Sequence, residues 1–190
     1  MSDTLLAWLA RVAAALDEHD VPYAVAGGLG LAAWGCARAT TDLDLVIASS
    51  DRDVTAARVA AQQAGLLQHR RSPIRFKAIS MLRMIAAPSA DTVIPVDLIL
   101  IPPALESALL QRAARLPLGP VAGAFASPED LVLLKLLRDS DQDRVDIRAL
   151  AERNQLDRAY VKARARALRV TSRLTRALPA WFRRRSRRER

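Results

Sequence analysis

Hydrophobic residues recur along the chain with two spacings, one typical of helices and one typical of strands. In residues 4–18, apolar side chains return every three or four positions, which predicts an amphipathic helix. The segments 41–47 (TDLDLVI) and 93–101 (VIPVDLILI) are short and mostly apolar, so both are predicted strands, the second a central one. We further expect strands at 23–26, 76–84 and 121–126, and helices at 29–34, 52–64, 104–114, 128–138 and 143–153.

The helix expected after residue 127 has a clear start signal. Ser127 is a good N-cap, Pro128 suits the first turn, and Glu129 and Asp130 lie beside the positive end of the helix dipole. Taken together, strands and helices are mixed along the chain, and this order predicts an α+β or α/β fold.

The C-terminal segment combines an apolar face with a basic one. Apolar residues recur at steps of three and four, which predicts a helix face able to dock on the rest of the protein: Tyr160, Ala163, Ala167, Val170, Leu174, Ala177 and Trp181. A basic stripe runs beside it, mostly one position earlier: Arg158, Lys162, Arg166, Arg169, Arg173 and Arg176. We expect this stripe to bind the phosphate backbone of a nucleic acid, although an anionic membrane surface would also suit a basic amphipathic helix.

The charge of the chain is concentrated in the same segment. The protein has 190 residues and a net charge of +9, but residues 158–190 alone carry 13 Lys and Arg against one acid, for a net charge of +12. The first 157 residues therefore carry a net charge of −3. Such an asymmetry usually marks contact with a polyanion, whereas a solvated, poorly ordered end is the alternative for residues 183–190.

The composition narrows the class of protein. Apolar residues make up 51% of the chain, enough for a normal core, and aromatics only 4%, so the core is expected to be aliphatic. The single cysteine, Cys36, excludes an internal disulfide and a cysteine-based zinc site. Because we find neither a signal peptide nor an apolar stretch long enough to span a bilayer, we expect a soluble, cytoplasmic protein without a membrane span.

Three carboxylates lie inside the two most apolar strands. Asp42 and Asp44 are two residues apart and therefore project from the same face of their strand, while Leu43 and Leu45 point to the core. Asp97 sits between Val96 and Leu98, with no basic residue nearby in the sequence. Buried carboxylates are costly unless they are paired or bind a cation. We therefore expect the three acids to converge on divalent metal, Mg²⁺ or Mn²⁺, the alternative being a separate structural reason for each acid.

A glycine pair precedes these acids by one strand. Gly27 and Gly28 follow the strand expected at 23–26 and open a short helix. Glycine lets backbone N–H groups approach a phosphate closely, although glycine pairs also make ordinary turns.

The stretch AGGLGLAAWGCARATTDLDLVI, residues 26–47, resembles the polymerase-beta-type nucleotidyltransferase superfamily, and most of all its AbiEii-type branch of abortive-infection and toxin–antitoxin systems. The branch pattern of a glycine pair, Arg-x-Thr and Asp-x-Asp falls on Gly27, Gly28, Arg38, Thr40, Asp42 and Asp44. Its second motif, a lysine followed by two spaced acids, falls on Lys135, Asp143 and Asp146. The resemblance implies an α+β (α/β-like) nucleotidyltransferase fold, with a small mixed sheet flanked by helices over residues 1–155 and a basic helical extension over 156–190.

The resemblance also implies a reaction, in which an acceptor hydroxyl attacks the α-phosphate of a nucleoside triphosphate (NTP) and pyrophosphate leaves. Asp42 and Asp44 would bind two metal ions, with Asp97 as a third ligand or as the proton acceptor. Gly27, Gly28 and Lys135 would hold phosphate groups; Lys135 could instead be a surface lysine. Arg38 and Thr40 fall in the same nucleotide site, and Arg38 could instead pair with Asp44. Asp143 and Asp146 would orient Lys135 or the base, or lie on a solvated helix face.

The acceptor is less constrained by the sequence. RNA, and transfer RNA in particular, is our first expectation, because the AbiEii-type branch is associated with it and Trp181 and Phe182 could stack on bases. A small molecule or a protein is a second possible acceptor. A third hypothesis is a non-catalytic partner of a cognate toxin or antitoxin protein.

Overall fold

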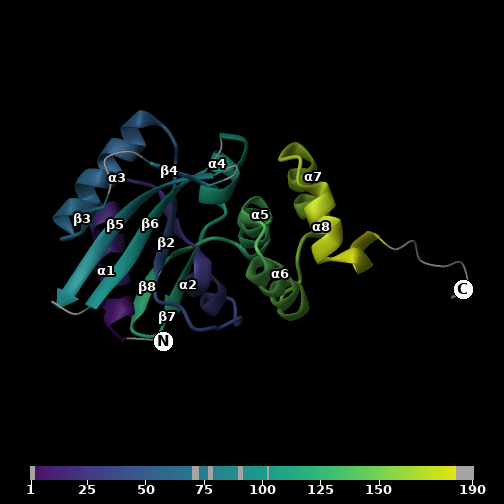
Figure 1. The fold of residues 1–190 in the computed structure, drawn as a ribbon, viewed down its shortest axis with the longest axis horizontal. Helices are drawn as coiled ribbons and strands as arrows, with labels where there is room; N and C mark the ends of the chain where they lie inside the picture. Colours follow the sequence, from purple (N-terminus) through teal and green to yellow (C-terminus); the bar gives the residue numbers. More distant parts are fainter. Residues whose placement is uncertain (1–2, 70–72, 77–78, 90–91, 102, 183–190) are drawn as a thin grey trace, which may run out of the picture.

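The computed structural model describes residues 3–69, 73–76, 79–89, 92–101 and 103–182 and shows one mixed sheet with helices packed on both faces (Figure 1). The strands are β1 (Tyr23–Val25), β2 (Leu43–Ile47), β3 (Leu67–Gln68), β4 (Ile74–Phe76), β5 (Ile79–Ser89), β6 (Thr92–Leu100), β7 (Ala114–Leu118) and β8 (Val121–Phe125). The helices are α1 (Asp3–Glu18), α2 (Gly27–Ala33), α3 (Asp51–Gln63), α4 (Pro103–Gln111), α5 (Pro128–Arg138), α6 (Asp141–Arg153), α7 (Arg158–Ala167) and α8 (Thr171–Ala177), followed by a short 3-10 helix (Pro179–Phe182). The predicted fold class is confirmed.

The strand order is β3-β5-β6-β2-β1-β8-β7, with β4 paired to β5. Strands β2 and β6 are parallel neighbours, as are β1 and β8, whereas the other pairs are antiparallel. Strand β6, predicted to be central, lies between β5 and β2. The two most apolar segments of the chain are therefore hydrogen-bonded to each other inside the sheet.

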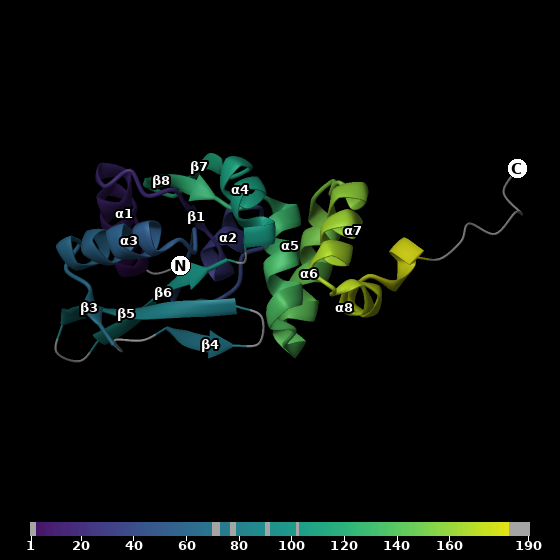
Figure 2. The ribbon, with the colours of Figure 1, turned by 90° about the horizontal axis from the view of Figure 1, so that it is seen from above.

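Each face of the sheet has its own hydrophobic cluster. On one face, Leu43 and Leu45 pack with the apolar sides of α1 and α3. On the other face, Val46 packs with a cluster that includes α5 and the helices that follow it. Figure 2 shows α1 and α3 on one side of the strands and α5 to α8 stacked beyond the end of the sheet. Because side chains alternate along a strand, Asp44 points to the same face as Val46, toward α5.

Two serines begin the helices that border the site. Ser127 caps α5 as predicted, with its side chain accepting a hydrogen bond from the Asp130 N–H. Ser140 caps α6 in a reciprocal arrangement, in which the Asp143 carboxylate accepts from the Ser140 N–H. Between them, Asp139 takes a left-handed conformation, with φ of 55°, so that the chain turns sharply from α5 into α6.

Some predicted boundaries are wrong. Where we expected one strand at 76–84, the structure has two antiparallel strands. The first, β4, ends at Phe76, residues 77–78 lie outside the described residues, and the second, β5, continues to Ser89. Strand β7 was not predicted, because a proline at position 117 lowers its strand propensity. As an edge strand of this sheet, β7 tolerates that proline.

The continuous C-terminal helix that we predicted is also wrong. The chain breaks at Arg169, whose φ is 57°, and this separates α7 from α8. The buried face consists of Val161, Ala165, Val170, Leu174 and Ala177, while Ala163 and Ala167 are exposed. The helices α7 and α8 therefore pack on α5 and α6 as part of the second hydrophobic cluster. No helix within the described ranges is both long and apolar enough to cross a membrane.

Candidate active site

Two of the predicted carboxylates meet across neighbouring strands. Asp44 on β2 and Asp97 on β6 are direct register partners in the parallel pair, so their side chains leave the same face of the sheet side by side. Both are buried, with 8% and 3% of their surface exposed. Their neighbours Leu43, Leu45, Val96 and Leu98 turn to the opposite face and fill the core there. The alternation of side chains thus directs Asp44 and Asp97 toward α5 and these four apolar neighbours away from it.

Asp42 completes the group from the residue just before β2. Its carboxylate accepts a hydrogen bond of 2.6 Å from the Thr40 hydroxyl, and it is partly exposed. Burial, together with the charges of Asp42 and Asp97, raises the pKa of Asp44 to about 7, against a smaller opposing effect of Arg138 and Lys135. Three carboxylates therefore lie close together, and burial beside the other two makes the Asp44 carboxyl hard to ionise.

Arg83 belongs to this site and, like Arg138 on α5, was not expected from the sequence. It lies on β5 opposite Asp97, and its guanidinium donates two hydrogen bonds to that carboxylate, Nε to Oδ1 at 2.8 Å and Nη2 to Oδ2 at 2.6 Å. No basic residue lies near Asp97 in the sequence, but Arg83 lies beside it in space. The available signal was a lone arginine between the buried Leu82 and Met84.

The glycine pair lies against Asp44 and Thr40. Gly27 is the first residue of α2, with a φ of +54°, and a Cβ built on it would lie 1.7 Å from Asp44 Oδ2. A Cβ on Gly28 would lie 2.5 Å from the Cβ of Thr40. The absence of side chains at both positions is therefore needed for Asp44 and Thr40 to lie where they do.

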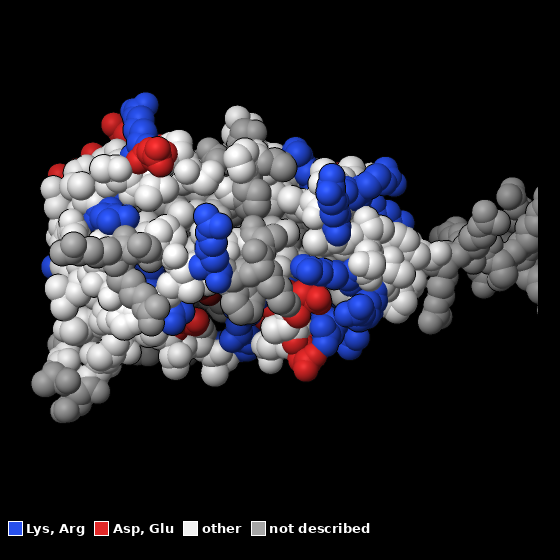
Figure 3. Space-filling model, turned by 45° about the horizontal axis from the view of Figure 1, so that its top comes forward, with Lys and Arg blue, Asp and Glu red and all other residues white. Residues whose placement is uncertain are grey.

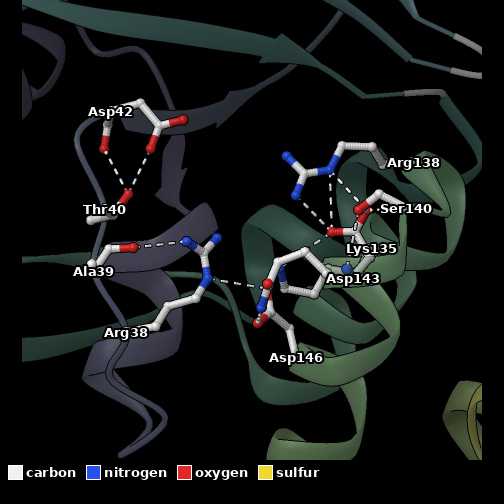
Figure 4. A network of polar contacts seen from close by, with 10 residues as sticks. Arg38, Ala39, Thr40, Asp42, Lys135, Arg138, Ser140, Asp143 and Asp146 are labelled. Atoms are coloured by element: carbon white, nitrogen blue, oxygen red, sulfur yellow. Dashed lines mark hydrogen bonds and ion pairs between the residues drawn. The ribbon is translucent and has the colours of Figure 1, made fainter.

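Lys135 belongs to a buried ion-pair network rather than to the surface. Its ammonium lies 2.5 Å from Asp146 Oδ2 and 3.5 Å from Asp143 Oδ1, and the residue is only 5% exposed. Arg138 donates to both oxygens of Asp143, at 2.9 Å from Nε and 2.7 Å from Nη2 (Figure 4). Burial acts to raise the pKa of Asp143, but hydrogen bonds from Arg138 and Ser140 outweigh it and lower that pKa to about 2. Asp143 and Asp146 thus hold Lys135, and the alternative of a solvated acidic face is wrong.

Arg38 joins this network from the other side. Its Nε lies 3.3 Å from Asp146 Oδ2, so it pairs with Asp146 and not with Asp44. Figure 4 shows the loop that carries Arg38, Thr40 and Asp42 facing the side chains of α5 and α6. A small pocket lies between the start of α2, the strands β2 and β6, and the helices α5 and α6, and its lining includes Gly27, Asp44, Lys135, Arg138 and Asp143.

Solved structures share this arrangement of strands and helices. One is ANT(2")-Ia in complex with adenylyl-2"-tobramycin, with a TM-score of 0.58 and 15% identity over 90% of this chain and 99% of that one. The chain has the nucleotidyltransferase fold. Another is an antigenic nucleotidyltransferase-like protein from Paracoccidioides brasiliensis, with a TM-score of 0.52 and 20% identity over 95% of this chain and 94% of that one. A third is the lincomycin-bound lincosamide antibiotic adenylyltransferase LnuA, with a TM-score of 0.50 and 12% identity over 81% of this chain and 99% of that one. No protein-family model and no curated protein sequence matches the chain.

Within this nucleotidyltransferase fold, the ligands that the site could offer to a metal ion are carboxylate oxygen atoms. Among the described residues, no group of three His, Cys, Asp or Glu side chains is arranged closely enough to hold a metal ion as it stands. Asp97 is engaged by Arg83, and Asp42 accepts a bond from Thr40. Asp44 differs, because no hydrogen bond or ion pair reaches its buried carboxylate from the described part of the chain. A cation would relieve that lone buried charge, so Asp44 with Asp42 suits a hard divalent metal.

The predicted basic stripe divides into two groups on the nucleotidyltransferase fold. Arg173 donates to the carbonyls of Leu136 and Leu137 at the end of α5, and Lys162 donates to the carbonyl of Trp181. Arg158 lies over the Trp181 ring, 5.2 Å from its centre. The remaining three, Arg166, Arg169 and Arg176, are exposed, as is Arg158. On the face shown in Figure 3, Lys and Arg side chains are denser over the C-terminal helices than over the sheet.

Proposed function

We propose that the protein is a metal-dependent nucleotidyltransferase, which moves a nucleoside monophosphate from an NTP to an acceptor hydroxyl. The observation that carries the proposal is the register pairing of Asp44 with Asp97, beside Asp42 and the glycine-started helix α2. A pair of buried carboxylates in adjacent strands, one of them without any polar partner in the described chain, is a costly arrangement unless a cation is bound there. The nucleotidyltransferase fold of the chain supports the same reaction class.

Each group of the site has a part in this reaction. Asp42 and Asp44 would hold Mg²⁺ or Mn²⁺, with Asp97 beside them as a further ligand or proton acceptor. The bound metal would supply charge stabilisation for the attacking and leaving oxygens. Gly27 and Gly28, whose missing side chains make room for Asp44 and Thr40, would offer the triphosphate backbone N–H groups. The cations Lys135 and Arg138 line the same pocket and would offset phosphate charge.

The buried acids Asp143 and Asp146 would act through Lys135 and not on the substrate. By holding the ammonium from α6, they fix its position without requiring a substrate contact. From the loop before β2, Arg38 forms an ion pair with Asp146, and Thr40 donates a hydrogen bond to Asp42. These residues therefore arrange the nucleotide site as a unit.

RNA remains our first proposal for the acceptor. The exposed Arg166, Arg169 and Arg176, with the net positive charge of the C-terminal segment, suit a phosphate backbone. A role beside a cognate toxin or antitoxin, which follows from the AbiEii-type resemblance, would agree with an RNA substrate.

A small hydroxylated molecule is the second candidate acceptor. It is favoured by the likeness over 90% of this chain to ANT(2")-Ia with adenylyl-2"-tobramycin and over 81% of it to lincomycin-bound LnuA. In this case the basic residues of α7 and α8 would not matter for turnover.

One experiment tests the reaction and names the acceptor. The protein is incubated with each α-³²P-labelled NTP, Mg²⁺ and cell lysate, and labelled RNA, protein and small molecules are separated. The expected result is transfer by the wild type and none by Asp44→Ala. Absence of any labelled acceptor with all four NTPs contradicts the proposal, and a biological effect that Asp44→Ala retains favours the non-catalytic partner.

The two acceptors are separated by charge substitution rather than by truncation. Removing α7 and α8 would uncover the buried side chains that they share with α5 and α6. The triple substitution of Arg166, Arg169 and Arg176 by glutamine keeps those contacts. It should reduce labelling of RNA and leave labelling of a small molecule unchanged.

A further inference from the structure

The Arg83–Asp97 pair occupies the place where a third metal ligand is expected. Both oxygens of Asp97 accept from the guanidinium, at 2.8 and 2.6 Å, in the two-point geometry that makes arginine–carboxylate pairs strong. A divalent cation and Arg83 would therefore use the same two oxygens. Asp97 cannot serve both fully at once.

Arg83 also lies in the field of the whole acidic group. Its pKa is raised by the hydrogen bond and charge of Asp97 and, to a smaller extent, by the charges of Asp42 and Asp44, against the opposing effect of its own burial. A metal ion beside Asp42 and Asp44 would consequently be repelled by the guanidinium while that group stays in place.

The two members of the pair differ in their freedom to move. The Asp97 side chain is 5% exposed and is fixed in a central strand, whereas the Arg83 side chain is 38% exposed. Arginine can turn its charged end to water at small cost, but a buried carboxylate cannot leave its strand. If one partner moves when a cation binds, it is Arg83.

We propose that Arg83 is an internal competitor of the divalent metal, a positioning residue that neutralises Asp97 in the metal-free protein and must release at least one of its oxygens before Asp97 can ligate. Arg83 thereby sets the metal affinity of the site. The inference rests on the proposed function in taking Asp42, Asp44 and Asp97 as metal ligands.

The test measures Mn²⁺ binding to the whole protein without nucleotide, by calorimetry and by the electron paramagnetic resonance signal of free Mn²⁺. In Arg83→Gln, the affinity should rise by about tenfold or more, on the scale that outer ligand-sphere contacts have in metal sites. The Mn²⁺ affinity of Arg83→Lys should lie between those of the wild type and Arg83→Gln, because an ammonium cannot engage both oxygens of Asp97. Arg75→Gln, an exposed arginine on the neighbouring strand β4, is the matched control and should match the wild type.

A second pair of variants separates competition from general charge repulsion. In an Asp97→Asn background, adding Arg83→Gln should change Mn²⁺ affinity far less than in the wild type, because the shared oxygens are gone. An equal increase in both backgrounds, or no increase in the wild type, overturns the proposal. If Arg83→Gln does not fold, Arg83→Lys gives the same comparison.

Failure of this inference and failure of the proposed function have different signatures. If Arg83→Gln binds Mn²⁺ like the wild type while the wild type still transfers label from an NTP, the competition between Arg83 and the metal is refuted and the transferase activity stands. Tighter Mn²⁺ binding in Arg83→Gln without any labelled acceptor removes the transferase and leaves a regulated metal site.

Discussion

Gly27 lies against Asp44 so closely that a Cβ on the glycine would come within 1.7 Å of the carboxylate oxygen Oδ2. Gly27→Ala must therefore displace Asp44, and it also places alanine at a φ of +54°. We expect nucleotide transfer to fall by at least about a hundredfold, on the scale known for displaced catalytic groups.

Gly35→Ala is the matched control for this effect. Gly35 has a φ of +75°, but a Cβ there would meet no described atom within 4 Å. It should carry only the backbone cost, about 1–2 kcal/mol of unfolding free energy, and retain activity. Equal losses of activity in the two variants would show that the contact with Asp44 is unimportant.

Asp44 should be destabilising in the metal-free protein. Its buried carboxylate stands beside Asp42 and Asp97 and lacks a hydrogen-bond partner in the described chain. Asp44→Asn should raise the free energy of unfolding at pH 8 without metal by about 1–3 kcal/mol, while abolishing transfer. Urea unfolding with and without Mg²⁺ checks this: Mg²⁺ should stabilise the wild type and leave the variant unchanged. A variant less stable than the metal-free wild type would contradict it.

Asp143 should stabilise the protein in a pH-dependent way. Its folded pKa of about 2 is below the ordinary 3.8, so its contribution is fully present above about pH 4 and is lost as the pH falls through 2. Asp143→Asn should lower the free energy of unfolding by about 2–4 kcal/mol at pH 7, because Lys135 and Arg138 lose a buried partner. The difference from the wild type should shrink at pH 2.5.

Asp141→Asn provides the comparison on the same helix. The Asp141 side chain is 94% exposed and pairs with Arg144. Such a surface pair contributes little, so this variant should unfold like the wild type. A comparable loss in both variants would show that burial of the network is not what gives it strength.

Arg173 should act in folding rather than in nucleic-acid binding, contrary to its place in the predicted stripe. It donates to two carbonyls at the end of α5 and lies 3.4 Å from Asp139. Arg173→Gln should cost about 1–2 kcal/mol of stability. Arg166→Gln should leave the melting temperature unchanged and, if RNA binds, reduce the salt dependence of binding by about one counterion. Melting curves and RNA titrations at several salt concentrations separate the two.

The strands that carry the acids could be predicted because both are short, mostly apolar segments. The acids inside them could be recognised because isolated aspartates in such segments are unusual. Strands 41–47 and 93–101 were recognised from their β-branched residues, and their alternation placed Asp42 and Asp44 on one face. The cost of burying three carboxylates predicted that they converge, but the adjacency of the two strands and the register pairing of Asp44 with Asp97 could not be read from local patterns. Strand order depends on contacts between distant segments, which local patterns do not encode.

The partners of the acids were harder to predict than the acids themselves. Arg83 reaches Asp97 from a neighbouring antiparallel strand, and its register cannot be read from the sequence. Arg138 follows Lys135 by three residues, but only the tight turn at Asp139 brings both toward Asp143. In the C-terminal segment, the periodicity extended through Arg169, where the backbone turns without a glycine or proline to signal it.

The ion pair between Arg38 and Asp146 joins segments 108 residues apart, and Asn154 on the same side donates to the carbonyl of Trp34. The loop between α2 and β2 is thus bonded at two points to α6 and to the residue that follows it. Any rotation of α6 would pull on this loop and, through Thr40, on Asp42. A shift of α6 would then be coupled to the position of the Asp42 carboxylate.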